Sequence, residues 1–194
     1  MTGPSIRAAC GALSVAAALT AAGCTGPTPS AAAPAVTLDQ VVVRSDEAGA
    51  AHERHILRFD VAESIAGEFF ACAERKRKPR SIHIMDQFGN TILAARMDGQ
   101  ISDNVDAARM KAKTALYFRD NTGRWLNRSK ADPLMAHWIA QLNQFTSPVG
   151  LPIVVEDQLL GTIGMGGASG DCAHEALTAV LGPQPPLEPP PEPQ

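Results

Sequence analysis

The stretch Ser81–Phe118, SIHIMDQFGNTILAARMDGQISDNVDAARMKAKTALYF, decides the fold of this chain. Two extended apolar segments flank a predicted turn at Asp86–Asn90, where glycine and asparagine tolerate the positive φ that a tight hairpin turn needs. The pair Ser102–Asp103 then offers good helix N-caps, and an alanine-rich segment follows it. The stretch therefore predicts a β-hairpin that runs into a helix over about 103–119.

The segment before this unit shows a helical pattern that starts at Ile56 and stops before Pro79. Its apolar residues recur at spacings of three and four, at Leu57, Val61, Ile65, Phe69 and Cys72. The run Val41–Val43 is compatible with a short strand or with a helix start, so it stays open. The basic run 75–78 is best explained as a solvated last turn that complements the helix dipole, with an anion or lipid-headgroup site as the alternative.

The segment after the unit predicts a loop over 121–130 and then a short helix that starts at Asp132-Pro133. The apolar face of this short helix consists of Leu134, Trp138, Leu142 and Phe145. A second hairpin over 151–167 and a closing helix over 172–181 complete the pattern. This order of elements predicts an α+β domain with an antiparallel sheet flanked by helices.

The composition limits the class of protein. A chain of 194 residues with 45% hydrophobic side chains is sufficient for one domain with a real core. Its formal charge of −3 and its pI of about 5.9 argue against the broad basic surface of a nucleic-acid-binding protein. We therefore expect no nucleic-acid partner.

Both ends of the chain differ from its middle. Residues 1–23 have one basic residue, an apolar run and small residues before Cys24, which resembles a bacterial lipoprotein signal; an ordinary cleaved signal is the alternative. We expect export to the periplasm or outer cell envelope and lipidation of Cys24, which would be the only attachment to a membrane. Residues 24–35 are a predicted tether, 36–182 the folded domain, and 183–194 a proline-rich disordered tail.

Motifs that carry chemistry by their spacing are few. The chain has no CxxC pair, zinc-protease motif, nucleophile elbow or Walker loop, and no nucleophile with its base is visible. The five histidines do not cluster along the sequence, so a metal site formed in three dimensions stays open. Catalytic residues are therefore not predicted from spacing alone.

Four sequence patterns follow one another over about 56–181. They are Asp86-x-x-Gly89, Arg96-Met97-Asp98-Gly99, Lys111-Ala112-x-Thr114-Ala115 with Phe118, and Gly150-Leu151-Pro152-Ile153 followed by Gly161-x-Ile163-Gly164. In this order and spacing they look like the GlcG/HbpS-type haem-binding (haem-degrading) family. The resemblance implies that any enzyme activity is slow haem degradation at most.

The resemblance implies a profilin-like single domain that assembles into homo-oligomers and binds haem or a related tetrapyrrole. The implied function is an exported haem- or iron-binding protein for storage, sensing or delivery. The alternative is a non-haem accessory or structural oligomer that supports a periplasmic oxidoreductase system. Function transfers weakly from fold, so both stay open.

The residues carried by the resemblance predict the ligand site. Arg96 and Lys111 would pair with haem propionates or another anion, Asp98 would orient one of them, and Thr114 and Phe118 would face the ring. The alternative for Arg96 and Asp98 is that they fix the corner between hairpin and helix through local hydrogen bonds.

Two departures from the family pattern add candidates for the axial haem ligand. Met165 lies in Gly164-Met165-Gly166-Gly167, where the family usually has Gly-Val-Ser-Gly, and His174 replaces part of an Asp-Glu pair. The axial candidates are therefore His174, Met165 and Thr114. The alternatives are a core position for Met165 and a first-turn helix position for His174.

The resemblance also implies a disulfide. Terminal helices of profilin-like domains often share one face of the sheet, so Cys72 and Cys172 are predicted to pair in an oxidising compartment. This bond would close a loop of about 100 residues, for which chain entropy alone predicts a stabilisation of roughly 4 to 5 kcal/mol.

Overall fold

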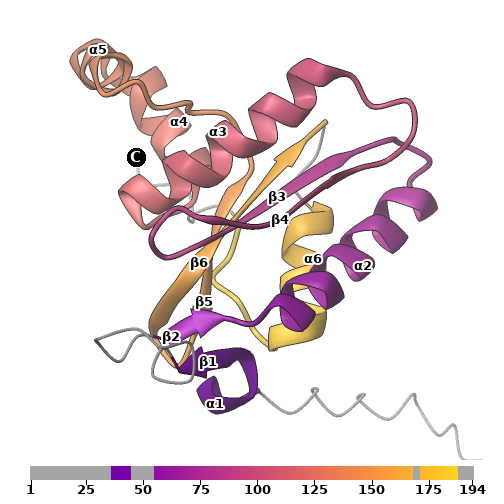
Figure 1. The fold of residues 1–194 in the computed structure, drawn as a ribbon. Coiled ribbons are helices and arrows are strands. Elements are labelled where there is room, and N and C mark those ends of the chain that lie inside the picture. Colours follow the sequence, from indigo (N-terminus) through magenta and orange to yellow (C-terminus); the bar gives the residue numbers. More distant parts are fainter. Residues whose placement is uncertain (1–35, 45–54, 168–170, 188–194) are drawn as a thin grey trace, which may run out of the picture. The chain divides into compact units, whose positions relative to one another are not determined.

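A computed structural model describes residues 36–44, 55–167 and 171–187 (Figure 1). The chain divides into the units Met1–Ala32 and Ala33–Gln194, and every described residue belongs to the second. That unit has its own sheets, core and disulfide. The predicted signal, Cys24, the tether and most of the tail lie outside the described residues.

The described elements follow one another in this order: α1 (Leu38–Val41), β1 (Val42–Arg44), β2 (His55–Leu57), α2 (Phe59–Arg75), β3 (Ser81–Asp86), β4 (Thr91–Arg96), α3 (Ser102–Phe118), α4 (Thr122–Ala131), α5 (Pro133–Gln141), β5 (Gly150–Val155), β6 (Gln158–Gly166) and α6 (Asp171–Leu181). The main sheet has the order β4-β3-β6-β5, and all its neighbours are antiparallel. The α+β prediction is confirmed. Among the described helices, none combines the length and apolarity needed to cross a bilayer.

The hairpin-to-helix unit is confirmed as β3, β4 and α3. Gly89 has a φ of +87°, and the Asp86 carboxylate accepts hydrogen bonds from the backbone N–H of Phe88 and of Asn90, at 2.8 and 2.9 Å. The predicted cap is wrong, because the N-cap of α3 is Ile101 and has no capping side chain. Instead, the side chain of Gln100 accepts a hydrogen bond from the backbone N–H of Ile101 at 3.0 Å. The side chain that fixes the start of the helix therefore belongs to the residue before the N-cap.

Two predictions for neighbouring segments are corrected. Leu57 belongs to β2 rather than to the first helix, because it pairs with Val42 of β1. The predicted loop 121–130 is helix α4, which Asn121 caps by accepting a hydrogen bond from Gly123 N–H at 2.8 Å. The start of α5 after Asp132 is confirmed.

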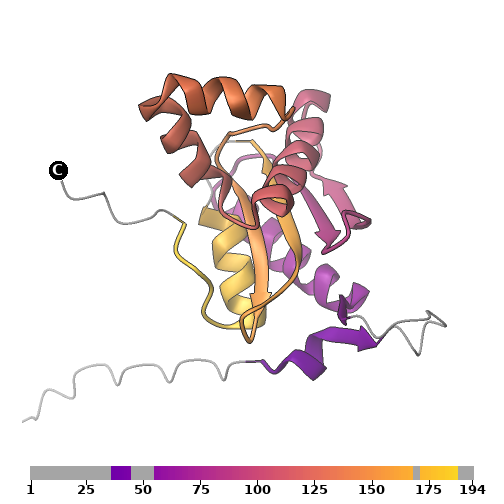
Figure 2. The same cartoon turned by 90° about the vertical axis from the view of Figure 1, so that its left-hand side faces the viewer.

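Helices cover both faces of the main sheet (Figures 1 and 2). Helices α2 and α6 pack on one face, where the apolar core lies; its sheet residues are Ile82, Ile84, Leu151, Ile153, Val155, Leu160, Ile163 and Met165. Helix α3 lies on the other face, where Thr162 Oγ1 donates to the carbonyl of Ala112 at 2.9 Å and Ser81 Oγ donates to that of Asn104 at 2.9 Å.

Helix α3 lies very close to strand β6. A Cβ added at Gly164 would meet the carbonyl oxygen of Ala108 at 2.0 Å, and one at Gly166 would meet that of Asn104 at 1.8 Å. Any side chain at these positions would push the helix away from the sheet. The small residues on both surfaces therefore set the distance between helix and sheet.

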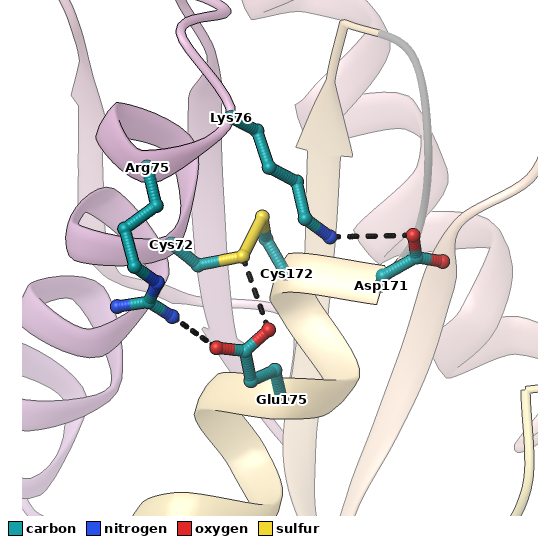
Figure 3. The surroundings of a disulfide bond; sticks show 6 residues. All are labelled: Cys72, Arg75, Lys76, Asp171, Cys172 and Glu175. Atoms are coloured by element: carbon teal, nitrogen blue, oxygen red, sulfur yellow. Dashed lines mark hydrogen bonds and ion pairs between the residues drawn. A yellow bond between two sulfur atoms is a disulfide. The ribbon is translucent and has the colours of Figure 1, made fainter. Parts of the chain in front are cut away.

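The predicted disulfide is confirmed and joins α2 to α6 (Figure 3). The Cα atoms of Cys72 and Cys172 are 5.5 Å apart, and both side chains are fully buried. Two ion pairs flank the bond: Arg75 contacts Glu175, and Lys76 Nζ lies 3.3 Å from an Asp171 carboxylate oxygen. The basic end of α2 is therefore partly neutralised by acidic side chains of α6.

Candidate functional site

An open hollow lies beside α3, where β6 ends and β5 begins. Its volume is about 470 Å³, within the range of ligand pockets. Residues of α3, of the segment before β5 and of the end of β6 line it: Asn104, Ala107, Lys111, Phe145, Ser147, Pro148 and Gly167. It adjoins one of the predicted ligand residues, Lys111.

Lys111 is a buried cation at the edge of this hollow. Its side chain is 5% exposed, and its Nζ donates a hydrogen bond to the backbone carbonyl of Met165 at 2.9 Å. Burial lowers the pKa of the Lys111 amine, because the charged form loses hydration. None of the ion pairs among the described residues includes Lys111. An anionic group in the hollow would therefore supply the counter-charge that these residues do not provide.

Thr114 and Phe118 follow Lys111 along the same side of α3. Thr114 is 1% exposed, and its Oγ1 accepts a hydrogen bond from Phe145 N–H at 2.8 Å, which ties the segment before β5 to the helix. Phe118 stacks on Trp125 of α4, with ring centroids 3.9 Å apart, and lies 6.1 Å from the Trp138 ring of α5. The predicted stripe therefore has three different neighbours: the hollow, the loop and an aromatic cluster.

Arg96 and Asp98 lie at the corner between β4 and α3, and both are exposed. The guanidinium of Arg96 donates to the Gln100 carbonyl at 3.0 Å, which is the local hydrogen bond that the alternative interpretation expects. The Asp98 carboxylate has no hydrogen-bond partner among the described residues. Arg96 and Lys111 therefore donate to different backbone carbonyls, those of Gln100 and Met165. Arg96 is nevertheless on the α3 face of the sheet, because it pairs in register with Ser81, whose side chain faces α3.

Gln100 holds this corner and was missed by sequence reasoning. It is 7% exposed, and its amide donates to the carbonyl oxygens of Pro79 and Gly166, at 3.0 and 3.4 Å. Its Oε1 accepts from Asn104 Nδ2 at 2.8 Å, and Asn104 lines the hollow. A glutamine between a turn glycine and a helix start gives no sequence signal of burial, so only the tertiary contacts identify it.

Met165 and His174 lie away from the hollow. The Met165 side chain is fully buried in the core formed with α2 and α6, although its carbonyl meets Lys111. His174 is on α6 and borders a separate small cavity beside Arg124 and Gln184. The His174 Nε2 atom is buried and has no hydrogen-bond partner among the described residues. The three axial candidates are therefore not brought together in one site.

His83 is a second buried titratable group on the α3 face. It is 7% exposed, and its Nε2 lies 3.0 Å from Thr91 Oγ1. Burial lowers the pKa of His83, and the positive charge of Arg109 lowers it further. No group of three or more His, Cys, Asp or Glu side chains within the described parts of the chain could hold a metal ion.

The chain resembles several solved structures. It is 25% identical to HbpS, with a TM-score of 0.59, and the match covers 69% of this chain and 96% of HbpS. It is 21% identical to the protein in the PduOC:haem complex, with a TM-score of 0.60 and coverage of 64% and 95%. Klebsiella pneumoniae ORFY is 21% identical, with a TM-score of 0.55 and coverage of 67% and 97%. These likenesses support the fold.

No curated protein matches the chain. A family model does: the model described as haem degrading protein HbpS-like matches residues 57–181, which spans α2 to α6 and so includes the whole main sheet, α3 and the hollow. The chain therefore belongs to the HbpS-like family of haem-degrading proteins.

Proposed function

We propose that this protein binds haem or a related tetrapyrrole in the hollow beside α3. The observation that carries the proposal is Lys111, a buried cation that faces the hollow and whose one hydrogen-bond partner within the described residues is a backbone carbonyl. A haem propionate would provide the missing anion. Membership of the HbpS-like family and the similarity to the PduOC:haem complex support this choice of ligand.

The residues around the hollow fit one edge of such a ligand. Lys111 would bind a propionate, Phe145 offers an aromatic surface, and Ser147 adds a polar group at the rim. Arg96 would bind a second carboxylate at the corner of the same sheet face, with Asp98 beside it to orient the guanidinium. Bound haem would supply a redox-active iron, while the protein would position it for storage, sensing or delivery.

The three candidates for the axial haem ligand differ in the rearrangement that each would need. Thr114 is next to the hollow, but its hydroxyl accepts the Phe145 N–H, so ligation would require this loop to shift. Met165 would have to leave the core, and His174 is on the other side of the sheet. We propose Thr114 as the candidate that needs the smallest rearrangement.

A haemin titration tests the proposal through the Soret band. We expect saturation at a defined stoichiometry, and Lys111→Ala should weaken binding by about tenfold or more, because a charge-assisted contact is lost. Lys113→Ala is the matched control, since Lys113 is an exposed lysine two residues away on the same helix. Equal affinity of wild type and Lys111→Ala would contradict the propionate role.

One observation favours a second candidate function. Among the described residues that line the hollow, none is a histidine or a methionine, so these residues offer no strong iron ligand. A non-haem accessory oligomer that supports a periplasmic oxidoreductase system is consistent with this lining. Absence of any Soret shift in the titration, with size-exclusion and light scattering showing a stable homo-oligomer, would favour it.

We also propose export and lipid anchoring at Cys24. The support is the sequence 1–23, with its apolar run and small residues before the cysteine. Cells supplied with a palmitate analogue should label the wild type and the Cys10→Ser variant but not Cys24→Ser. Label on Cys24→Ser would contradict the anchor.

A further inference from the structure

Helix α5 exposes Leu134 and Trp138 of the predicted apolar face, whereas the other two predicted members, Leu142 and Phe145, lie beyond the helix, which ends at Gln141. The helix, PLMAHWIAQ, contains no Asp, Glu, Lys or Arg. Leu134 is 75% exposed and Trp138 is 44% exposed. Two further apolar or aromatic side chains nearby are also exposed, Tyr117 by 52% and Phe145 by 36%. We call these four residues the α5 surface.

Ring contacts through Phe118 link two members of the α5 surface, Tyr117 and Trp138. Tyr117 makes an edge contact with Phe118, whose ring lies 6.1 Å from that of Trp138. Phe145 follows α5 in the chain and is tied to α3 through Thr114. Helix α5 packs mainly on α4 and buries Ile139, while Leu134 and Trp138 remain exposed (Figures 1 and 2).

Basic side chains predominate over acidic ones in the segment that carries this surface. Residues 113–145 contain five Lys and Arg residues and two Asp residues, whereas the whole chain has a formal charge of −3. Both aspartates are engaged: Asp120 pairs with Arg124 at 3.1 Å, and Asp132 caps α5. The other basic residues of this segment are all exposed: Lys113, Arg119, Arg128 and Lys130.

The positions of three of these cations relate them to the patch. Lys113 lies one turn before Tyr117 on α3, and Lys130 is in the last turn of α4, directly before α5. The guanidinium of Arg128 lies over the Trp125 ring, 4.8 Å from its centroid. Exposed aromatic and aliphatic groups with basic neighbours are the composition of surfaces that lie in a membrane interface.

We propose that the α5 surface docks on an anionic lipid surface, with Leu134 and Trp138 entering the headgroup region and the surrounding cations contacting lipid phosphates. A second copy of the chain fits less well, because a two-fold contact through this patch would bring the basic residues of both copies into one interface with few acidic partners. A lipid surface offers apolar depth and negative charge together. The proposal does not depend on the haem site or on lipidation of Cys24.

The test uses the unit Ala33–Gln194, which contains all the described elements and the core but not the apolar N-terminal run. Trp125 and Trp138 are the two tryptophans of the whole sequence, and both belong to the aromatic cluster. Their fluorescence should shift to the blue when phosphatidylglycerol vesicles are added and should change little with phosphatidylcholine vesicles. High salt should reverse most of the binding.

Two pairs of variants sharpen the test by co-sedimentation with phosphatidylglycerol vesicles. Leu134→Glu should weaken binding at least tenfold, whereas Ile101→Glu should not change it. Ile101 is 60% exposed but lies at the other end of α3, about 24 Å from Tyr117 by helical rise. Lys130→Glu should weaken binding several-fold. Lys78→Glu is the matched control, because Lys78 is an exposed lysine three residues beyond the end of α2.

Two outcomes would overturn the proposal. The first is equal vesicle binding by wild type and Leu134→Glu, with unchanged circular dichroism. The second is absence of vesicle binding by a wild type that self-associates and becomes monomeric in Leu134→Glu, which would assign the surface to a second copy.

Discussion

The two faces of the main sheet are built from different chemistry. The face under α2 and α6 is aliphatic, fully buried and closed by the Cys72–Cys172 disulfide. The face under α3 contains buried polar groups, among them Lys111, His83 and Thr162, and it opens into the hollow. The face under α2 and α6 therefore stabilises the fold. On the face under α3, burial of polar and titratable groups lowers stability, and this is the face where we place the ligand.

Removing the disulfide should have the largest effect on stability. The Cys72→Ala/Cys172→Ala variant should lose up to about 4 to 5 kcal/mol of unfolding free energy, since the loop of 100 residues is no longer closed in the unfolded chain. Denaturant unfolding with and without reductant measures this loss. Reductant should destabilise the wild type and leave the variant unchanged. A wild type whose stability does not respond to reductant would contradict the stabilising role of the disulfide on this face.

A side chain at Gly164 should disturb the α3 face almost as strongly. Gly164→Val should cost about 3 kcal/mol or more, because its Cβ would lie 2.0 Å from the Ala108 carbonyl oxygen and α3 would have to move. Thermal unfolding measures the effect. Gly67→Ala in α2 is the control: nothing lies within 4 Å of its Cβ position, and alanine should stabilise the helix by up to about 1 kcal/mol.

Lys111 should make stability depend on alkaline pH. Burial lowers its pKa in the folded state, so the unfolded chain binds the proton more tightly and the folded state becomes more stable as pH rises from the lowered value toward 10.5. This rise should be absent in Lys111→Met. Denaturant midpoints over that pH range measure the rise, and Lys113→Met should retain it. Identical pH profiles of the midpoint for the wild type and Lys111→Met would contradict this prediction.

His83 should give the smallest effect, at acidic pH. Its folded-state pKa is lowered from 6.5 by burial and then by Arg109, so stability should fall as pH decreases through 6.5 and the unfolded chain takes up the proton. His83→Gln should reduce this acid sensitivity, while the exposed His137→Gln should not. Unfolding midpoints between neutral and mildly acidic pH compare the three proteins. An unchanged acid response in His83→Gln would exclude His83 as its source.

Much of the fold follows from local patterns. The turn at Gly89, the Asp132-Pro133 helix start and the end of α2 before Pro79 each depend on residues a few positions apart, and each prediction is confirmed. Helix α4 was missed because its stabilising contact, Trp125 on Phe118, is tertiary. Leu57 was assigned to a helix because the residues between it and its strand partner, Val42, show no readable pattern.

The site was less predictable than the fold. The sequence identified Lys111, Thr114 and Phe118 through family resemblance, and all three lie along one side of α3. Their neighbours come from β6, from the segment before β5 and from α4, and the first two of these lie far from them along the chain. Gln100 became a buried hub only because α3, β6 and the segment before β3 meet there. Its contacts join residues up to 66 positions apart, so no local pattern encodes them.

The sequence by itself determined the order of most elements and the family, because periodicity, turn chemistry and spaced motifs are local properties of the chain. The cysteine pair was predicted through the resemblance to that family, since its two members are 100 positions apart. Only the tertiary structure decided that Lys111 is a buried cation beside a hollow, that Met165 belongs to the opposite core, and that the apolar face of α5 stays exposed. The physical reason is that burial and charge pairing depend on which distant segments meet, and helix–sheet packing sets those contacts.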